Sequence, residues 1–191
     1  GHSFSLPSEQ LLEIIDGMEM DLTQSRYLDF KGLSLYCYRV ASVVGLLAAE
    51  IFGYRDRQTL KYAHDLGMAF QLTNIVRDIG EDARRGRIYI PMDELKQFGV
   101  PAADILNSRY SENFSALMAF QVARAEKYYD QALSQLPAAD RKSQRPGLIM
   151  AAIYRTLLRE IANDDYRVLH QRIALTPVRK LWIAWKTWMF A

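Results

Sequence analysis

Glycine and proline, the residues that most often interrupt helices, are rare in this chain and stand at a few separated points. The 191 residues include 10 glycines and 6 prolines, and pairs such as Gly99 and Pro101 divide long apolar-rich segments. Within these segments apolar residues recur every three or four positions, as Val40, Val43 and Leu47 do, which is the spacing of one helix face. No segment alternates apolar and polar residues as a half-exposed strand does. The sequence therefore predicts an all-α fold.

The same interruptions delimit the expected helices. We predict helices at residues 7–26, 30–52, 56–82, 92–98, 102–136 with a break near 108, from the boundary at 145–147 through 170, and from 177 to the C-terminus. The last helix has a clear start signal, because Thr176 can cap it and Pro177 suits the first helical position.

Charge and length limit the classes of protein to consider. The 24 Lys+Arg and 22 Asp+Glu residues give a formal net charge of +2, which lacks the basic excess of a dedicated nucleic-acid binder. Half of the residues are hydrophobic, enough for the core of one domain. Cys37 is the single cysteine, which excludes an internal disulfide and fits a cytoplasmic protein. No uninterrupted apolar run reaches the roughly 18 residues of a membrane span.

A polar stripe lies on the helix predicted at residues 56–82. At about 100° per residue, Gln71, Asn74, Asp78 and Asp82 share one narrow arc. Carboxylate and amide oxygens are ligands for Mg²⁺, which fills its other positions with water and substrate phosphates. Several arginines follow, including Arg77 and Arg87, and the guanidinium fork suits phosphate oxygens. The alternative is an exposed helix face whose acids pair with these arginines.

The residues of this stripe also carry a family resemblance. The motif Gln71-x-x-Asn74-x-x-Arg77-Asp78-x-x-Glu81-Asp82-x-x-Arg85-Gly86-Arg87-x-Tyr89-x-Pro91 resembles the second aspartate-rich motif of squalene and phytoene synthases. Further resemblance covers residues 16–22, 36–45, 151–155 and 179–184, in the same order. Within the family, residues 36–45 and the later Phe52-Gly53 are most similar to bacterial presqualene diphosphate synthases.

The resemblance implies an isoprenoid-synthase fold and a head-to-head condensation of two farnesyl diphosphates, assisted by Mg²⁺, to presqualene diphosphate. It implies metal ligands at Asn74, Asp78 and Asp82, and diphosphate-binding or ordering residues at Gln71, Arg77 and Arg87. Tyr36 matches a tyrosine implicated in proton removal, and Tyr154 matches an aromatic residue of the cavity. Without the resemblance, the apolar neighbours of both favour ordinary core tyrosines. Val40 and Val44 could supply a dry wall for the cationic intermediate.

Other functions stay open. One alternative is phytoene synthesis from two geranylgeranyl diphosphates, and another is a non-catalytic assembly factor of the same fold. The joint presence of Asn74, Arg77, Asp78 and Asp82 favours an enzyme. No G-x-G-x-x-G loop follows a strand, so the sequence gives no ground for inferring NADPH.

The family's first aspartate-rich motif has no counterpart here. We therefore expect residues 4–191 to be the C-terminal two-thirds of one domain, preceded by a tag remnant at residues 1–3, and inactive or nearly so by themselves.

Three tryptophans, Trp182, Trp185 and Trp188, lie near basic residues at the C-terminal end. Such a helix either docks on its own domain or onto a part of the protein outside this sequence, the reading we favour, or rests on a membrane surface. Peripheral contact with the inner membrane is the corresponding expectation.

Overall fold

A computed structural model describes residues 8–190 of the chain. In that range the helices are α1 (Ser8–Thr23), α2 (Phe30–Cys37), α3 (Val43–Phe52), α4 (Gln58–Arg84), α5 (Met92–Gln97), α6 (Ala102–Leu106), α7 (Glu112–Gln135), α8 (Arg145–Asn163) and α9 (Pro177–Phe190). A π-helical segment, Tyr38–Ser42, joins α2 to α3, and a 3-10 turn, Ala138–Asp140, precedes α8. The β interaction recorded for the described residues is an isolated bridge between Arg26 and Ile88. The all-α prediction is confirmed, whereas the expected tag remnant lies outside the described residues.

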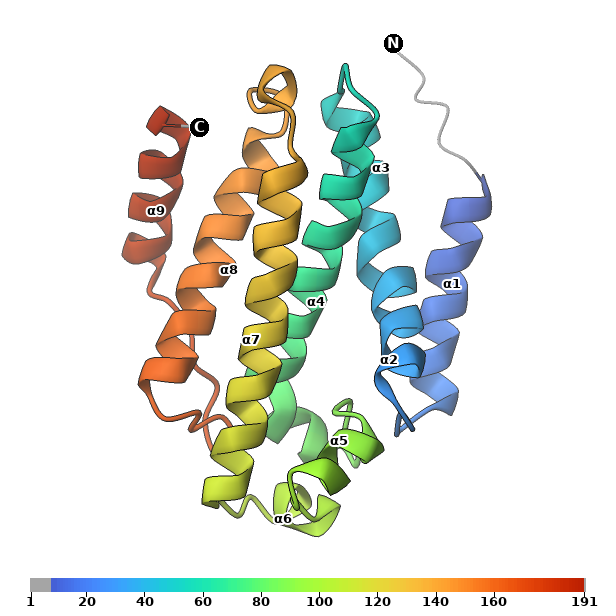
Figure 1. Ribbon diagram of the computed structural model, residues 1–191, viewed down its shortest axis with the longest axis vertical. Helices are drawn as coiled ribbons and strands as arrows, with labels where there is room; N and C mark the ends of the chain where they lie inside the picture. The colour runs from blue at the N-terminus through green and yellow to red at the C-terminus, as the bar shows by residue number, and fades with distance from the viewer. Residues whose placement is uncertain (1–7, 191) are drawn as a thin grey trace.

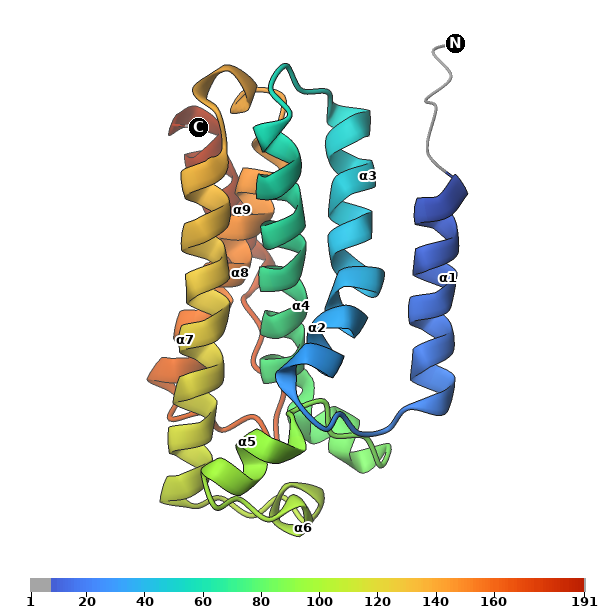
Figure 2. The same cartoon turned by 45° about the vertical axis from the view of Figure 1, so that its right-hand side comes forward.

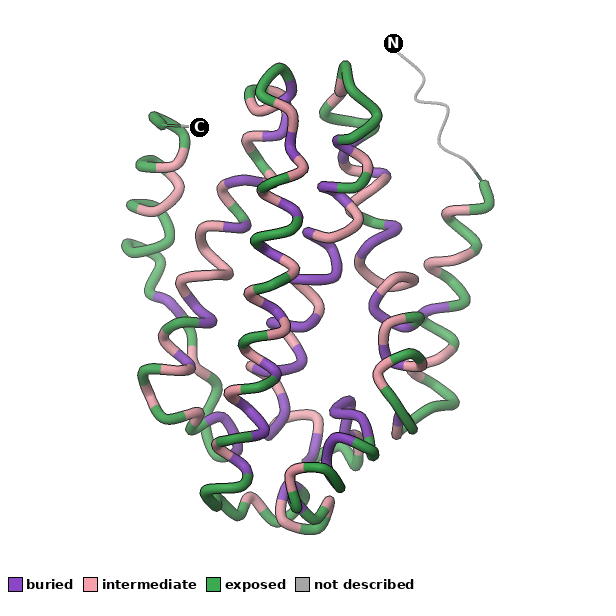
Figure 3. The backbone as a smooth tube through the Cα atoms, in the orientation of Figure 1, coloured by how far each residue is buried: buried purple, intermediate pink, exposed green. Residues whose placement is uncertain are grey.

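The long helices run along a common axis, and α5 and α6 lie across one end of the bundle (Figures 1 and 2). The pair α4 and α7 forms the centre, while α1 and α9 lie at the edges. Burial follows this arrangement, with buried residues along α4 and α7 and few on the outer helices (Figure 3). The bundle thereby places the polar stripe of α4 beside its central core.

Glycines allow the Phe30–Phe52 segment to cross α4 at very short range. A Cβ atom on Gly67 would lie 2.6 Å from the carbonyl oxygen of Ala41, and one on Gly45 would lie 2.6 Å from that of Ala63. No side chain fits at such distances, so both positions require glycine to let the two backbones touch. The predicted helix at 30–52 is confirmed in extent, and the π-helical segment adds a local widening that the apolar spacing did not reveal.

The same Phe30–Phe52 segment is, among the described residues, long and apolar enough to cross a membrane by length and composition, with a mean hydropathy of 1.5. Charged residues at Lys31, Arg39 and Glu50 interrupt it, which is why no unbroken apolar run appears in the sequence. A core helix meets the same criterion, and here the segment packs on α4.

The prediction that α8 continues to residue 170 is wrong. The helix ends at Asn163, because Asp165 and Tyr166 adopt left-handed backbone angles, with φ of 52° and 58°. Residues 164–176 then fold back over α4, where a Cβ atom on Gly80 would lie 2.2 Å from the carbonyl oxygen of Leu169. Apolar residues such as Leu169 continue at helix-like spacing beyond Asn163. Leu169 is buried there in a non-helical segment, so its position does not mark a helix face.

Other boundaries agree more closely. The break near Ser108 is confirmed, since this residue has a φ of 54° and separates α6 from α7. Helix α4 begins slightly later than expected, after a loop that buried Asp140 holds. Its carboxylate accepts hydrogen bonds from the backbone amides of Arg55 and Asp56, at 2.8 and 3.0 Å, and from the Thr59 hydroxyl at 2.7 Å.

Candidate functional site

A cavity of about 300 Å³ lies between the Phe30–Phe52 segment, α4 and α8. Five predicted site residues line it: Val40, Val44, Gln71, Asn74 and Tyr154. Most of the remaining wall is apolar, and the ring of Phe70 lies 5.0 Å from that of Tyr154, centroid to centroid. A larger groove, of about 620 Å³, lies between α7, α8 and α9, and none of the predicted site residues lines it. The smaller cavity is therefore the candidate site.

The polar stripe of α4 enters this cavity at Gln71 and Asn74. The Asn74 amide nitrogen lies 3.5 Å from Gln71 Oε1, at the limit of a hydrogen bond. The Asn74 amide oxygen is buried and has no hydrogen-bond partner among the described residues. A buried oxygen without a partner costs free energy, so this atom is poised to accept a donor or to bind a cation.

One turn further along α4, Asp78 is held by two arginines. Arg77 Nε lies 2.7 Å from Asp78 Oδ1, and Arg172 Nε lies 2.8 Å from the same oxygen. Burial alone would raise the pKa of Asp78, but hydrogen bonds and charge from both arginines outweigh it and hold the pKa below its ordinary value. Asp78 is therefore ionised at neutral pH. Pairing of the stripe's acids with arginines is the alternative that the sequence left open. The paired Asp78 nevertheless keeps an ionised carboxylate on the polar stripe of α4.

Asp82 has a different environment on the same face. No hydrogen bond or ion pair to its carboxylate is recorded within residues 8–190, and the side chain is half-buried. Burial, followed by the charge of Asp78, raises the pKa of Asp82 to about 6. Two carboxylates that repel each other at this end of α4 would both be relieved by a shared cation.

The three predicted ligands fit a magnesium ion by their chemistry. Asn74 offers a buried amide oxygen without a hydrogen-bond partner among the described residues. Asp82 offers a carboxylate whose pKa is raised despite the charges of Arg85 and Arg87, and Asp78 offers a carboxylate that arginines hold ionised. No group of three His, Cys, Asp or Glu residues suited to a metal occurs among residues 8–190. A three-ligand set on this face would therefore need the amide oxygen of Asn74, and Mg²⁺ ordinarily takes its remaining ligands from water and substrate phosphates.

Tyr36 and Arg87 lie outside the cavity lining, in a cluster against the end of α1. The Tyr36 and Tyr89 hydroxyls donate to the Asp21 carboxylate at 3.0 and 2.7 Å, and Arg87 Nη2 donates to the Asp21 carbonyl oxygen at 2.7 Å. Tyr27 joins them, with its ring 5.6 Å from that of Tyr36. Burial, then its tyrosine and aspartate neighbours, raises the pKa of Tyr36 well above its usual range. The catalytic role of Tyr36 remains a prediction. The hydrogen bond from Arg87 to Asp21 links the motif to α1.

Sequence reasoning missed two members of these clusters. Arg172 lies beyond the helix that the sequence predicts to end at residue 170, and only the return of residues 164–176 over α4 brings it to Asp78. Tyr89 belongs to the motif, but the sequence assigns it no role, and only the packing against α1 places both Tyr89 and Arg87 beside Asp21. By contrast, helical spacing alone predicted the arc of α4 from which Gln71 and Asn74 line the cavity.

A family model described as squalene/phytoene synthase matches residues 1–179, and the chain belongs to that family. It is 39% identical over 191 aligned residues to the phytoene synthase of Arthrospira platensis, covering 93% of this chain and 62% of that protein. It is 36% identical over 190 residues to the 15-cis-phytoene synthase of Synechococcus elongatus, again covering 93% and 62%. The chain thus spans about three fifths of the length of these relatives.

Solved structures support the fold. A dehydrosqualene synthase in complex with a ligand superposes with a TM-score of 0.85 at 26% identity, over 98% of this chain and 66% of that one. The squalene synthase HpnC from Alicyclobacillus acidocaldarius gives a TM-score of 0.75 at 27% identity, over 84% and 61%. The chain therefore has the all-α fold of isoprenoid synthases, as the resemblance implied.

Proposed function

We propose that the complete protein is a prenyltransferase that condenses two prenyl diphosphates head-to-head, and that its substrate is geranylgeranyl diphosphate with phytoene as the product. The relatives named above as phytoene synthases favour this substrate over the farnesyl diphosphate that the sequence pattern suggested. The proposal rests on the position of Asn74. Its buried amide oxygen has no hydrogen-bond partner among the described residues, and Asn74 lies where the acidic stripe of α4 meets the apolar cavity.

In this proposal Asn74, Asp78 and Asp82 hold Mg²⁺, which when bound neutralises negative charge on the diphosphate as it leaves. Gln71 and Arg77 lie beside these ligands and bind or order the diphosphate. These groups are fixed on one helix before substrate arrives, so little reorganisation is needed as charge develops.

The apolar wall performs the other half of the chemistry. Val40 and Val44 on one side and Tyr154 with Phe70 on the other exclude water from the allylic cation, which water would otherwise quench. The faces of the two rings can also stabilise positive charge.

The farnesyl reaction is the second candidate, since the dehydrosqualene synthase and HpnC structures share this fold. The test supplies the full-length gene product, with Mg²⁺, first geranylgeranyl and then farnesyl diphosphate, and identifies each product by mass. A forty-carbon hydrocarbon supports phytoene synthesis, and a thirty-carbon product alone supports the farnesyl reaction. Absence of both products would contradict the proposal. Running the 191-residue chain in parallel tests the expectation that it is inactive alone.

A further inference from the structure

Helix α9 presents its apolar side outward. At about 100° per residue, one arc about 120° wide contains Val178, Leu181, Trp182, Trp185, Trp188 and Met189. Each of these six side chains is between 53% and 77% exposed. The opposite arc contains Ile183, which is half-buried and packs on the core. A helix on the surface of a globular domain normally turns its apolar stripe inward. Trp182 lines the groove against α8, and the guanidinium of Arg145 lies over the ring of Trp188. Within the described residues, Leu181, Trp185 and Met189 remain as an exposed apolar surface suited to an interaction.

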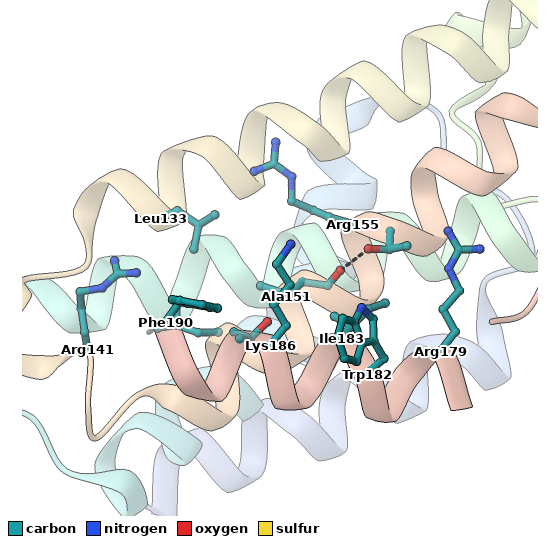
Figure 4. Close-up of a pocket in the computed structure, with 13 residues that line it drawn as sticks. Leu133, Arg141, Ala151, Arg155, Arg179, Trp182, Ile183, Lys186 and Phe190 are labelled. Atoms are coloured by element: carbon teal, nitrogen blue, oxygen red, sulfur yellow. Dashed lines mark hydrogen bonds between the residues drawn. The ribbon is translucent and has the colours of Figure 1, made fainter. Parts of the chain in front are cut away.

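The charges on α9 identify the kind of partner. Residues 177–190 include Arg179, Lys180 and Lys186 and no acid. The groove beneath the helix is lined by the cations Arg141, Arg155, Arg179 and Lys186, of which the last two belong to α9 itself (Figure 4). Of these, Arg155 and Arg179 are paired with acids, at 2.8 and 2.6 Å. No ion pair with an acid is recorded among residues 8–190 for Arg141 or Lys186. The outward stripe is therefore bordered by positive charge, which requires an anionic partner.

A second copy of the chain is a poor partner for this surface. Two copies meeting through α9 about a two-fold axis would bring the basic residues of one helix close to those of the other. No acid on either helix would offset the repulsion. A bilayer with anionic headgroups satisfies both features, since it accepts apolar side chains between its headgroups and attracts the cations around them.

The aromatic content and the length of α9 agree with a position in the membrane interface. Tryptophan is the residue most favoured there, and the rings of Trp182 and Trp185 stack with centroids 5.1 Å apart. The 14 residues of α9 extend about 21 Å at 1.5 Å per residue, which is too short to cross a hydrocarbon core of about 30 Å. These 14 residues therefore suit a position in the interface.

We propose that α9 binds the surface of an anionic membrane, with Leu181, Trp185 and Met189 inserted among the lipids and Lys180 and Lys186 on the headgroups. This surface is independent of the cavity, so the proposal does not rest on the condensation reaction.

The chain offers a direct probe, because its three tryptophans all lie on α9. The 191-residue protein is mixed with vesicles of phosphatidylcholine, or of phosphatidylcholine with phosphatidylglycerol. Tryptophan emission and co-sedimentation are then measured. We expect a blue shift and sedimentation with the anionic vesicles, and much less of either with phosphatidylcholine alone.

Two double variants separate the contributions while keeping every tryptophan. Leu181→Ser with Met189→Ser should abolish the blue shift, whereas Leu22→Ser with Leu28→Ser, at leucines outside α9 that are even more exposed, should not. Lys180→Gln with Lys186→Gln should weaken binding about fivefold per lysine, unlike Lys127→Gln with Lys142→Gln.

Three results would overturn the proposal. One is the absence of both signals with anionic vesicles, and another is equal binding by all four double variants. The third is a blue shift that appears without lipid as protein concentration rises and accompanies a doubled mass, which would assign the surface to a second copy.

Discussion

Arg172 lies 2.8 Å from Asp78, although 94 residues separate them in the sequence. The contact forms because residues 164–176 return over the end of α4 and place a guanidinium on a carboxylate that we propose as a magnesium ligand. Arginine and metal ion then compete for the same oxygen. Because of this competition, the proposed site should need a higher magnesium concentration with Arg172 than without it.

The variant Arg172→Gln should therefore lower the magnesium concentration needed for half-maximal turnover by the full-length enzyme. Removal of the guanidinium leaves Asp78 Oδ1 with Arg77 as its remaining arginine partner and makes the local potential more negative, and both effects favour the divalent ion. Magnesium titrations at saturating prenyl diphosphate measure the change. If instead the KM for substrate rises and the magnesium midpoint stays fixed, Arg172 binds diphosphate and the competition idea fails.

Conversion of Asp78 or Asp82 to asparagine should reduce turnover by the full-length enzyme about 100-fold or more, because changes even in the outer shell of a metal site cost about 10–100-fold. Product formation with excess Mg²⁺ is the measurement. Asp65→Asn is the matched control, since Asp65 lies on the same helix and bonds Gln135 at 3.1 Å away from the stripe. Turnover near the wild-type level in either stripe variant would refute the metal assignment.

The close crossing at Gly67 predicts a stability effect. Gly67→Ala places a methyl group 2.6 Å from both the Ala41 carbonyl oxygen and Ser42 Cα, so the free energy of unfolding should fall by about 1–3 kcal/mol. Gly32→Ala is the control, because its nearest contact is 3.6 Å away and alanine favours a helix by about 1 kcal/mol over glycine. Urea unfolding of both variants decides the matter. Equal stability of Gly67→Ala and wild type would mean that the helices are farther apart than the structure shows.

Asp140 predicts a pH dependence. Burial works to raise the pKa of Asp140, but the hydrogen bonds from Thr59 and from the amides of Asp56 and Arg55 outweigh it and lower the pKa. Stability from a group with a lowered folded-state pKa is present above its unfolded value of about 3.9. That stability is lost as pH falls through the folded value. The gap in unfolding free energy between wild type and Asp140→Asn should thus be widest near neutral pH and narrow below about pH 4. Denaturant titrations across that range measure it, and a gap independent of pH would show that the carboxylate charge is not responsible.

The local pattern of the sequence determined the helices and much of the cavity wall. Apolar residues every three or four positions define a helix face wherever the helix packs, and one arc of α4 placed Gln71, Asn74, Asp78 and Asp82 together before any neighbour was known. The family motif added their expected chemistry. These inferences succeeded because residues within a few turns of one helix have fixed relative positions.

Only the tertiary structure decided what meets that arc. It brought Arg172 to Asp78 and Asp21 to Tyr36 and Tyr89, left the Asn74 oxygen without a hydrogen-bond partner within residues 8–190, and ended α8 at Asn163. It also turned the tryptophan stripe of α9 outward. Each result depends on how distant segments pack and how far the backbone bends at single residues such as Asp165. Helical periodicity carries no information on either, because it describes the spacing of residues within one helix alone.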